Sequence, residues 1–288
     1  MSEKKTILML GYPATGKTTF LAALWYVLNN NNEVPGSLRL MSLGSNREYL
    51  NAIMDKWLTY EDVGRTPPSS ETTVSLDVSL ADGVQIELLF PDVSGERFRQ
   101  QFEDRMAAPE FFEKIGVSFG GLLFIHSDRI DTAMTISQRD TLAAIAEGGS
   151  SDNDDNVPEE IHAWDPSRAP TQVKLVDLLQ VLVSAPGVRR PFRLAVIVSA
   201  WDLIGCQFRK PSRFLISRLP LLHQYLESNP AAFKYSIYGV SALGGRIDLE
   251  ASLQELQQKN SPSERILVLD DKAAHHDITS PLKWLAGQ

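Results

Sequence analysis

The sequence has very little cysteine and no long apolar run. Cys206 is the single cysteine among 288 residues, so no disulfide can form within the chain and no cysteine-based metal module can be built. No apolar stretch approaches the roughly 18–20 residues that a membrane-spanning helix needs. The apolar stretch that follows Lys5 is far too short for a signal peptide. We therefore expect a cytoplasmic protein without a membrane span.

Basic residues are fewer than acidic ones. The chain has 28 lysines and arginines against 36 aspartates and glutamates, which gives a formal net charge of −8. This balance argues against general binding to nucleic acid. Apolar residues make up 43% of the sequence, which is ordinary for a soluble globular protein. A chain of this length can form a stable core without disulfides or metals.

The apolar pattern changes between the period of strands and that of helices. Residues 74–80 alternate apolar and polar side chains, which predicts a half-buried edge strand, and Asp82-Gly83 predicts a hairpin turn into a more apolar strand. Buried strands are expected at Thr6–Leu10, Ile86–Phe90, Leu122–Ile125, Leu194–Val198, Tyr235–Val240 and Ile266–Leu269. Helices are expected at 17–29, 47–58, 97–106, 172–183, 212–227 with a kink or split at Pro220, 248–257 and from Thr279. This order predicts an α/β fold with a doubly wound, mostly parallel sheet and one antiparallel edge strand.

Residues 147–160 differ in composition from the rest of the chain. They contain six acids and no base, together with a Gly-Gly-Ser-Ser run. Such a segment cannot bury a core, so we expect an acidic surface insertion within about residues 130–171. A calcium loop is the alternative, but the spacing of the acids does not match an EF-hand.

A phosphate-binding motif follows the first predicted strand. Gly11-x4-Gly16-Lys17-Thr18 fits the P-loop pattern G-x-x-x-x-G-K-[ST] and opens a predicted helix. Glycines let the backbone N–H groups curl around phosphate oxygens, and the start of the helix adds a positive dipole. Lys17 would bridge the β- and γ-phosphates, and the Thr18 hydroxyl would bind Mg²⁺. The candidate phosphate-binding residues are Gly11, Ala14, Thr15, Gly16, Lys17, Thr18 and Thr19.

A second motif follows the predicted strand Ile86–Phe90. In Asp92-Val93-Ser94-Gly95, the aspartate at the strand end can hold Mg²⁺ through water. The backbone N–H of Gly95 can meet the γ-phosphate, so the loop after it could change state on hydrolysis.

Candidate base-reading residues follow two later strands. Asp202 comes just after the strand Leu194–Val198, and a carboxylate there can accept hydrogen bonds from guanine N1–H and the exocyclic amine. Ser241 and Ala242 follow the strand Tyr235–Val240, where a backbone N–H could meet the guanine carbonyl. Trp201 could flank the base or pack in the core, and the sequence leaves both alternatives open.

These motifs together resemble the Ras-like, translation-factor-related P-loop GTPases, from the first strand to about residue 257. In that family the base-reading motif is Asn-Lys-x-Asp; here Ser199 and Ala200 stand at its first two positions. In detail the sequence resembles bacterial GTPases of the double-GTPase type, which sit in multi-gene conflict or defence operons. This finer resemblance rests on the run from Gly11 to Leu24, the Asp-Val-Ser-Gly-Glu motif, an extra helix before the first switch, and residues 281–285.

The resemblance also implies switch and catalytic residues. A first-switch threonine would complete the Mg²⁺ shell, and the candidates are Thr66, Ser70, Thr72 and Thr73. Of these, we expect Thr66 or Thr72 to be the metal ligand. Glu96 follows Gly95, where many relatives have a glutamine that orients the attacking water. Its charge would face the γ-phosphate, so we expect slow or partner-stimulated hydrolysis. Arg65 could act as an arginine finger in cis, or be an ordinary surface charge.

The sequence therefore predicts a single GTPase domain over residues 1–288, with a C-terminal extension at about 260–288. The expected function is a molecular switch that binds Mg²⁺ and GTP or GDP and is read by a protein effector or activating partner. Two alternatives remain: a pseudo-GTPase scaffold, and a P-loop ATPase or kinase.

Overall fold

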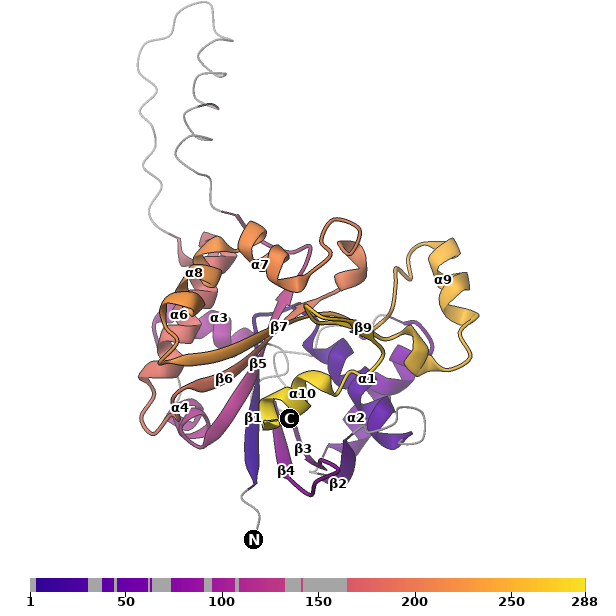
Figure 1. Ribbon diagram of the computed structural model, residues 1–288, viewed down its shortest axis with the longest axis horizontal. Helices are drawn as coiled ribbons and strands as arrows, with labels where there is room; N and C mark the ends of the chain where they lie inside the picture. The colour runs from indigo at the N-terminus through magenta and orange to yellow at the C-terminus, as the bar shows by residue number, and fades with distance from the viewer. Residues whose placement is uncertain are drawn as a thin grey trace, which may run out of the picture.

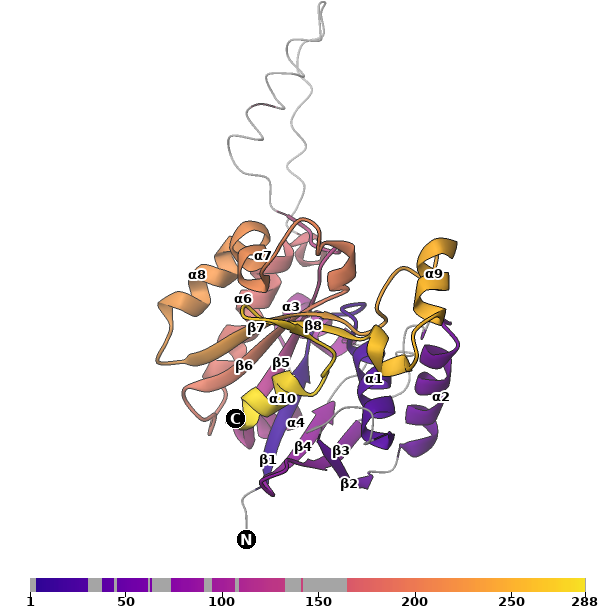
Figure 2. The same cartoon turned by 45° about the vertical axis from the view of Figure 1, so that its right-hand side comes forward.

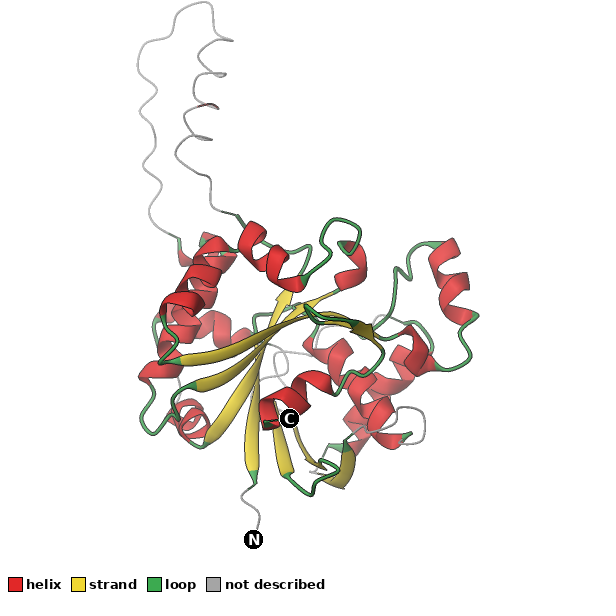
Figure 3. Cartoon of the chain, in the orientation of Figure 1, coloured by secondary structure: helices red, strands yellow, loops and turns green. Residues whose placement is uncertain are grey.

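The described residues form one nine-stranded sheet with helices on both faces (Figures 1 and 3). The computed structural model describes residues 4–30, 38–43, 46–61, 63, 74–90, 95–106, 109–132, 141 and 165–287. The strand order in the sheet is β2-β3-β4-β1-β5-β6-β7-β8-β9. The predicted α/β class is therefore confirmed.

The five central strands run parallel to one another. The buried residues of these strands are almost all apolar, and β1, β5 and β6 read as nearly continuous apolar runs in the sequence because helices cover both faces. In sheet order they are β4 (Gln85–Phe90), β1 (Lys5–Leu10), β5 (Ser118–His126), β6 (Phe192–Ser199) and β7 (Phe233–Ser241).

The prediction of one antiparallel edge strand is wrong. At one end of the sheet β3 (Val74–Ser79) is covered by a further antiparallel strand, β2 (Arg39–Leu43). At the other end, β8 (Leu267–Leu269) and β9 (Ala274–His275) are also antiparallel. The polar face of β3 suggested solvent, yet Asp77 on that face accepts a hydrogen bond from Ser42 of β2 at 2.9 Å. Polar side chains that pair across strands look the same in the sequence as exposed ones.

The helices form two layers, which Figures 1 and 2 show on opposite sides of the sheet. One layer shares an apolar core with the sheet and consists of α1 (Lys17–Asn29), α2 (Arg47–Leu58) and α10 (Ser280–Ala286). The other has its own core and consists of α3 (Glu96–Asp104), α4 (Pro109–Gly116), α6 (Thr171–Ser184), α7 (Pro211–Arg218) and α8 (Pro220–Ser228). A further helix, α9 (Glu250–Gln257), lies on the α1–α2 side in both views.

Proline divides the predicted helix at 212–227. The structure ends α7 at Arg218 and starts α8 at Pro220, with Leu219 between them at φ −137° and ψ 54°. Proline has no N–H for the helix ladder and disfavours helical geometry at the residue before it. The predicted split at Pro220 is therefore confirmed.

The segment predicted as a C-terminal extension packs into the sheet and its core. Residues 262–286 form the short helix η3 (Pro262–Arg265), then β8, β9 and α10. The Arg265 guanidinium lies 3.8 Å from the centre of the Trp57 ring and donates to the Trp57 carbonyl at 2.6 Å. Leu282 and Leu285 of α10 are fully buried. This segment therefore contributes to the same core as α1 and α2.

The acidic insertion is predicted within about residues 130–171. Most of that range, namely residues 133–140 and 142–164, lies outside the described part of the chain. Within the described part of the chain, no helix has the length and apolar character needed to cross a membrane.

Candidate nucleotide-binding site

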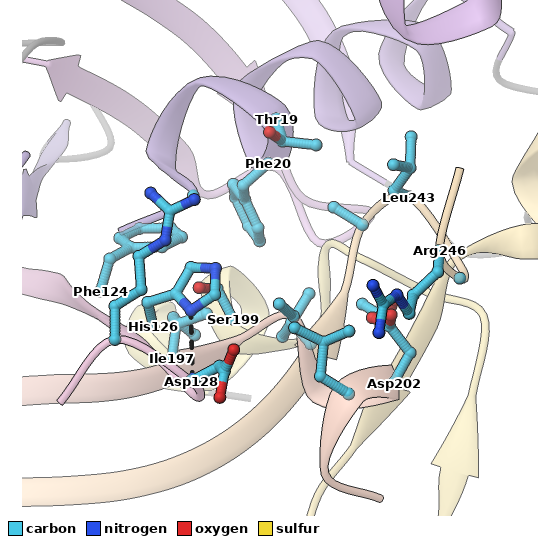
Figure 4. A pocket seen from close by; sticks show the side chains of 18 of the residues that line it. Thr19, Phe20, Phe124, His126, Asp128, Ile197, Ser199, Asp202, Leu243 and Arg246 are labelled. Atoms are coloured by element: carbon cyan, nitrogen blue, oxygen red, sulfur yellow. Dashed lines mark hydrogen bonds between the residues drawn. The ribbon is translucent and has the colours of Figure 1, made fainter. Parts of the chain in front are cut away.

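A cavity of about 650 Å³ opens where the parallel strands end (Figure 4). Ligands in open α/β sheets bind at this carboxyl edge, because the loops that follow the strands meet there. Gly16, Thr19 and Phe20 line the cavity from the start of α1. The remaining walls come from the ends of β5, β6 and β7 and from the loop after β7, including Phe124, His126, Ser199, Asp202, Ser241, Ala242 and residues 245–248.

The loop between β1 and α1, which is the predicted phosphate loop, depends on left-handed backbone conformations and a close approach to β6. Ala14 and Gly16 have φ of 58° and 86°, in the left-handed region. A Cβ on Gly16 would lie 2.9 Å from both Cβ and Oγ of Ser199. Glycine at 16 thus allows both the turn and the close approach of β6. All seven predicted phosphate-binding residues, Gly11 and 14–19, lie in this loop and the first turn of α1.

The ammonium group of Lys17 lies inside the loop. The side chain is only 3% exposed, and Nζ donates to the carbonyl oxygens of Gly11 at 2.6 Å and Tyr12 at 2.8 Å. Thr15 also closes the loop, because its hydroxyl donates to the Tyr12 carbonyl at 2.8 Å. The loop therefore holds a buried positive charge beside the helix start, a combination that attracts an anion.

Gly95 lies against this loop. A Cβ on Gly95 would be 2.6 Å from Lys17 Nζ and 2.7 Å from the Gly11 carbonyl oxygen, and its φ is 81°. The next residue, Glu96, begins α3, and its carboxylate forms an ion pair with Arg99 at 2.8 Å. The start of α3 is thus in direct contact with the phosphate loop.

Several predicted residues lie outside the described part of the chain. These are the arginine-finger candidate, the Mg²⁺ aspartate and the first-switch candidates: Arg65, Asp92, Thr66, Ser70, Thr72 and Thr73.

Asp202 and Ser241 lie together at the other end of the cavity. Asp202 is in the short helix η2 (Trp201–Leu203) after β6, and its Oδ1 accepts a hydrogen bond from the Ser241 hydroxyl. That hydroxyl also accepts from the Gly244 N–H at 3.1 Å. Ala242 lines the same cavity, and its carbonyl accepts from Trp57 Nε1 at 2.9 Å. The three predicted base-reading residues therefore meet at one wall.

Trp201 packs in the core and does not line the cavity. It is 2% exposed and forms an edge-to-face contact with Phe214, with ring centroids 6.1 Å apart. A Cβ on Gly239 of β7 would lie 2.4 Å from an atom of its indole ring. Of the two alternatives for this residue, the structure supports packing.

Two residues at this edge have roles that the sequence did not predict. Ser199 donates to the Thr15 carbonyl oxygen at 2.8 Å, which ties the end of β6 to the phosphate loop. His126, the last residue of β5, faces the cavity, and its Nδ1 accepts from the Asp128 N–H at 3.1 Å. Burial and the neighbouring Arg129 lower the pKa of His126. The sequence signal that could have identified these two residues is their position directly after the predicted strands Leu122–Ile125 and Leu194–Val198.

The loop between β1 and α1 is also joined to the opposite helical layer. The Tyr12 hydroxyl donates to the Lys174 carbonyl of α6 at 3.0 Å. In the same helix Asp177 accepts from Gln101 of α3 at 3.3 Å and pairs with Arg105, just past the end of α3. Burial is the main cause that raises the pKa of Tyr12. Through α6, the loop and α3 share one set of contacts.

The fold and the cavity define an α/β protein with its candidate site at the carboxyl edge of a mostly parallel sheet. The chain belongs to the Double-GTPase 1 family, whose sequence model matches residues 8–285. The predicted resemblance to translation-factor-related GTPases of the double-GTPase type is thus confirmed. Membership of this family supports GTP as the nucleotide.

Comparison with solved structures gives a likeness to the Ski7 GTPase-like domain of S. cerevisiae, whose crystal structure was determined bound to GTP. The two chains are 16% identical, with a TM-score of 0.43. The match covers 90% of this chain and 51% of that one, so the present chain spans about half the length of the yeast chain. A search of curated proteins found no match.

Proposed function

We propose that the chain is a molecular switch that binds Mg²⁺-GTP and hydrolyses it slowly or on stimulation by a partner. Membership of the Double-GTPase 1 family supports GTP. The observation that carries the switch is the contact of Gly95 with Lys17 and Gly11. Through this contact, the presence or loss of a γ-phosphate at the loop would change the position of Gly95 and of the start of α3.

The phosphate end of the proposed site depends on Lys17 and on the backbone of residues 11–16. A phosphate that enters the loop would replace the Gly11 and Tyr12 carbonyls as partners of the Lys17 ammonium. Exchange of two neutral acceptors for a charged one strengthens the hydrogen bonds, because bonds between ionised groups are shorter and stronger. Lys17 thus binds and orients the phosphates.

The predicted Mg²⁺ ligands are all oxygen donors, which suits this ion. They are the hydroxyl of Thr18, the carboxylate of Asp92, and the hydroxyl of Thr66 or Thr72. Thr18 is the described member of the set, and it lies in the first turn of α1 directly after Lys17. When bound, Mg²⁺ would neutralise charge on the β- and γ-phosphates.

Slow hydrolysis follows from the state of Glu96. Its carboxylate is paired with Arg99 on the same helix, so a water-orienting role requires a different arrangement of α3. A carboxylate near the γ-phosphate also meets like charge, which is costly away from water. An arginine from Arg65 or from a partner would offset that charge.

The contacts through α6 suggest where a partner would read the nucleotide state. Asp177 holds Gln101 and Arg105 of the α3 region, and Lys174 holds Tyr12 of the loop. A change at Gly95 would therefore reach α3 and α6 together. We propose a protein effector at these helices, within a cytoplasmic bacterial conflict or defence system and with all of 1–288 as one GTPase domain.

A pseudo-GTPase scaffold is the second candidate. Lys17 already has two carbonyl partners in the loop, and Ala200 stands at the position of the lysine in the Asn-Lys-x-Asp motif of Ras-like GTPases. A scaffold would keep these contacts for stability of the loop and bind nucleotide weakly or not at all.

Calorimetric titration with a non-hydrolysable GTP analogue and its ATP counterpart, each with Mg²⁺, tests the proposal. We expect binding of the guanine form, and a loss of at least about tenfold in affinity, or about 1.4 kcal/mol, in Lys17→Ala and Thr18→Asn. Lys259→Ala, an exposed lysine beyond α9, is the matched control and should bind normally. Unchanged affinity in Lys17→Ala would refute the site. Preference for the adenine form would indicate an ATPase, and no binding at all would indicate the scaffold.

A further inference from the structure

His126 is one of the residues that line the cavity. It ends β5, the strand between β1 and β6, and pairs in register with Ser199 of β6. Residues in register on parallel strands point to the same face of a sheet. Figure 4 shows the imidazole of His126 pointing into the cavity beside Ser199, with Phe20 and Asp202 across from it.

One ring nitrogen of His126 has a fixed role. Nδ1 lies 3.1 Å from the backbone nitrogen of Asp128, whose N–H can only donate. Nδ1 therefore carries a lone pair, and the proton of the neutral ring is on Nε2. Burial and Arg129 lower the pKa of His126, which favours this neutral form near pH 7. Figure 4 shows the second nitrogen on the side of the ring away from Asp128, toward the cavity. His126 thus presents one N–H donor to a ligand.

The side chains of the neighbouring residues, Ser199 at the end of β6 and Ala200 just after it, offer no donor of this kind. The Ser199 hydroxyl has a single proton, which goes to the Thr15 carbonyl at 2.8 Å, with the Ile125 carbonyl at 3.3 Å as the alternative acceptor. The methyl group of Ala200 has none. His126 therefore supplies a side-chain hydrogen-bond donor to a part of the cavity wall where the side chains of Ser199 and Ala200 supply none.

Asp202 and His126, which both line the cavity, have complementary hydrogen-bonding character. Asp202 is an acceptor, held in place by the Ser241 hydroxyl, and suits the N1–H and amine of guanine. His126 is a donor and suits an edge that carries acceptors. Guanine has two on its N7–O6 edge, whereas adenine replaces the O6 acceptor with an amino donor. Because N7 is an acceptor in both bases, a donor fixed by its tautomer discriminates between them at position 6, where it meets the O6 acceptor of guanine but the amino donor of adenine.

We propose that His126 is a specificity-determining residue whose Nε2–H donates to the N7–O6 edge of a bound guanine. The proposal rests on the proposed function, since it requires a guanine nucleotide in this cavity. It assigns recognition of the base to two strand ends, β5 and β6. The donor comes from β5, and the acceptor, Asp202, follows β6.

The test compares GDP and ADP affinities for the wild type, His126→Phe and His126→Gln, each with Mg²⁺. We expect His126→Phe to weaken GDP binding about tenfold and ADP binding much less, so that the ratio of the two affinities falls. Glutamine keeps an N–H donor and should retain most of the preference. The matched control is His223→Phe on α8, the same substitution outside the cavity, and it should leave both affinities unchanged.

A second measurement uses the unmodified protein, in case His126→Phe folds poorly. Two GDP analogues, 7-deaza-GDP and 6-thio-GDP, weaken the acceptors of this edge while they keep the N1–H and amine that Asp202 would bind. At least one should bind the wild type several-fold more weakly than GDP. Where His126→Phe folds, that difference should be absent from it.

The outcomes separate the two proposals. If the wild type binds neither GDP nor ADP, the proposed function fails. If it prefers GDP, but both analogues bind as tightly as GDP and the ratio in His126→Phe is unchanged, His126 does not read the base and only this inference fails. An equal loss of GDP and ADP in His126→Phe would indicate contact with the ribose or phosphates and would also overturn it.

Discussion

The hydroxyl of Ser199 donates to the backbone carbonyl oxygen of Thr15 at 2.8 Å, although the two residues are 184 positions apart in the sequence. The bond joins the end of β6, which leads into Asp202, to the loop that holds Lys17. This one side-chain hydrogen bond therefore links the predicted phosphate-binding and base-binding parts of the candidate site.

Ser199→Ala should weaken both folding and nucleotide binding. The substitution removes this partly buried hydrogen bond to the Thr15 carbonyl, so we expect the free energy of unfolding to fall by about 1 kcal/mol. The loop is then less fixed, and GDP affinity should fall as well. Denaturant unfolding and calorimetry measure the two effects. Ser184→Ala is the control, because that exposed hydroxyl bonds only within α6, to Gln180. Equal stability of the two variants would contradict the prediction.

Gly95→Ala should disrupt the contact between α3 and the phosphate loop. Its Cβ would lie 2.6 Å from Lys17 Nζ, so either the lysine or the helix start must move. Gly83, in the turn after β3, has almost the same φ, 84° against 81°, but a Cβ there meets nothing within 4 Å. Gly83→Ala should therefore cost only the backbone strain, about 1–2 kcal/mol.

Comparison of the two glycine variants separates the effect of backbone strain from the effect of the close contact between residue 95 and Lys17. Unfolding experiments should show Gly95→Ala to be the less stable, and calorimetry should show loss of GTP-analogue binding in that variant alone. If both variants bind the analogue like the wild type, the approach of Gly95 to Lys17 does not matter for the site.

The turn after β1 and the helix α1 were predictable because their signals are local. Gly11, Gly16 and Lys17 lie within seven consecutive residues, and the apolar period from Phe20 to Leu28 marks α1 without reference to any other part of the chain. In contrast, β2 and β9 are short strands that exist through pairing with β3 and β8. Their residues carry no period of their own long enough to detect.

The candidate site was predictable only where a motif carries it. Asp202 and Ser241 were predicted from their places after strands, but the bond between them depends on the parallel register of β6 and β7. The roles of Ser199 and His126 depend likewise on which residues the register of β5 and β6 brings together. No periodicity encodes a contact between residues that are distant in the sequence.

Trp201 and Gly239 should behave as a coupled pair. Gly239→Ala would place Cβ 2.4 Å from the indole ring, and overpacking of this kind costs about 1–3 kcal/mol. The displaced ring would also move its neighbour Asp202, so GDP affinity should fall. Adding Trp201→Phe makes room for the new methyl group. Unfolding of the wild type, both single variants and the double variant should show a coupling of at least about 0.5 kcal/mol in favour of the double variant. Simple additivity would show that the ring does not press on this position.

The pKa of His126 should make stability depend on pH. Burial, then Arg129, lowers this pKa below the ordinary histidine value of about 6.5. The unfolded chain therefore takes up its proton first as the pH falls. The contribution of His126 to stability is complete above about pH 6.5 and is lost as the pH falls through the folded pKa. A protonated ring also loses the bond from the Asp128 N–H, because Nδ1 can no longer accept it.

His126→Gln isolates this contribution from those of the other histidines. Glutamine does not titrate, so the free energy of unfolding of the variant should depend less steeply on pH between about 5 and 7, the range on either side of the ordinary histidine value. Asp128 and Asp202 act in the opposite direction to Arg129 on His126, so removal of either carboxylate should lower its pKa further. NMR titration of the His126 ring measures the pKa directly. A midpoint at or above the ordinary histidine value would show that the ring is not held neutral, and the donor that it offers to the cavity would then need another explanation.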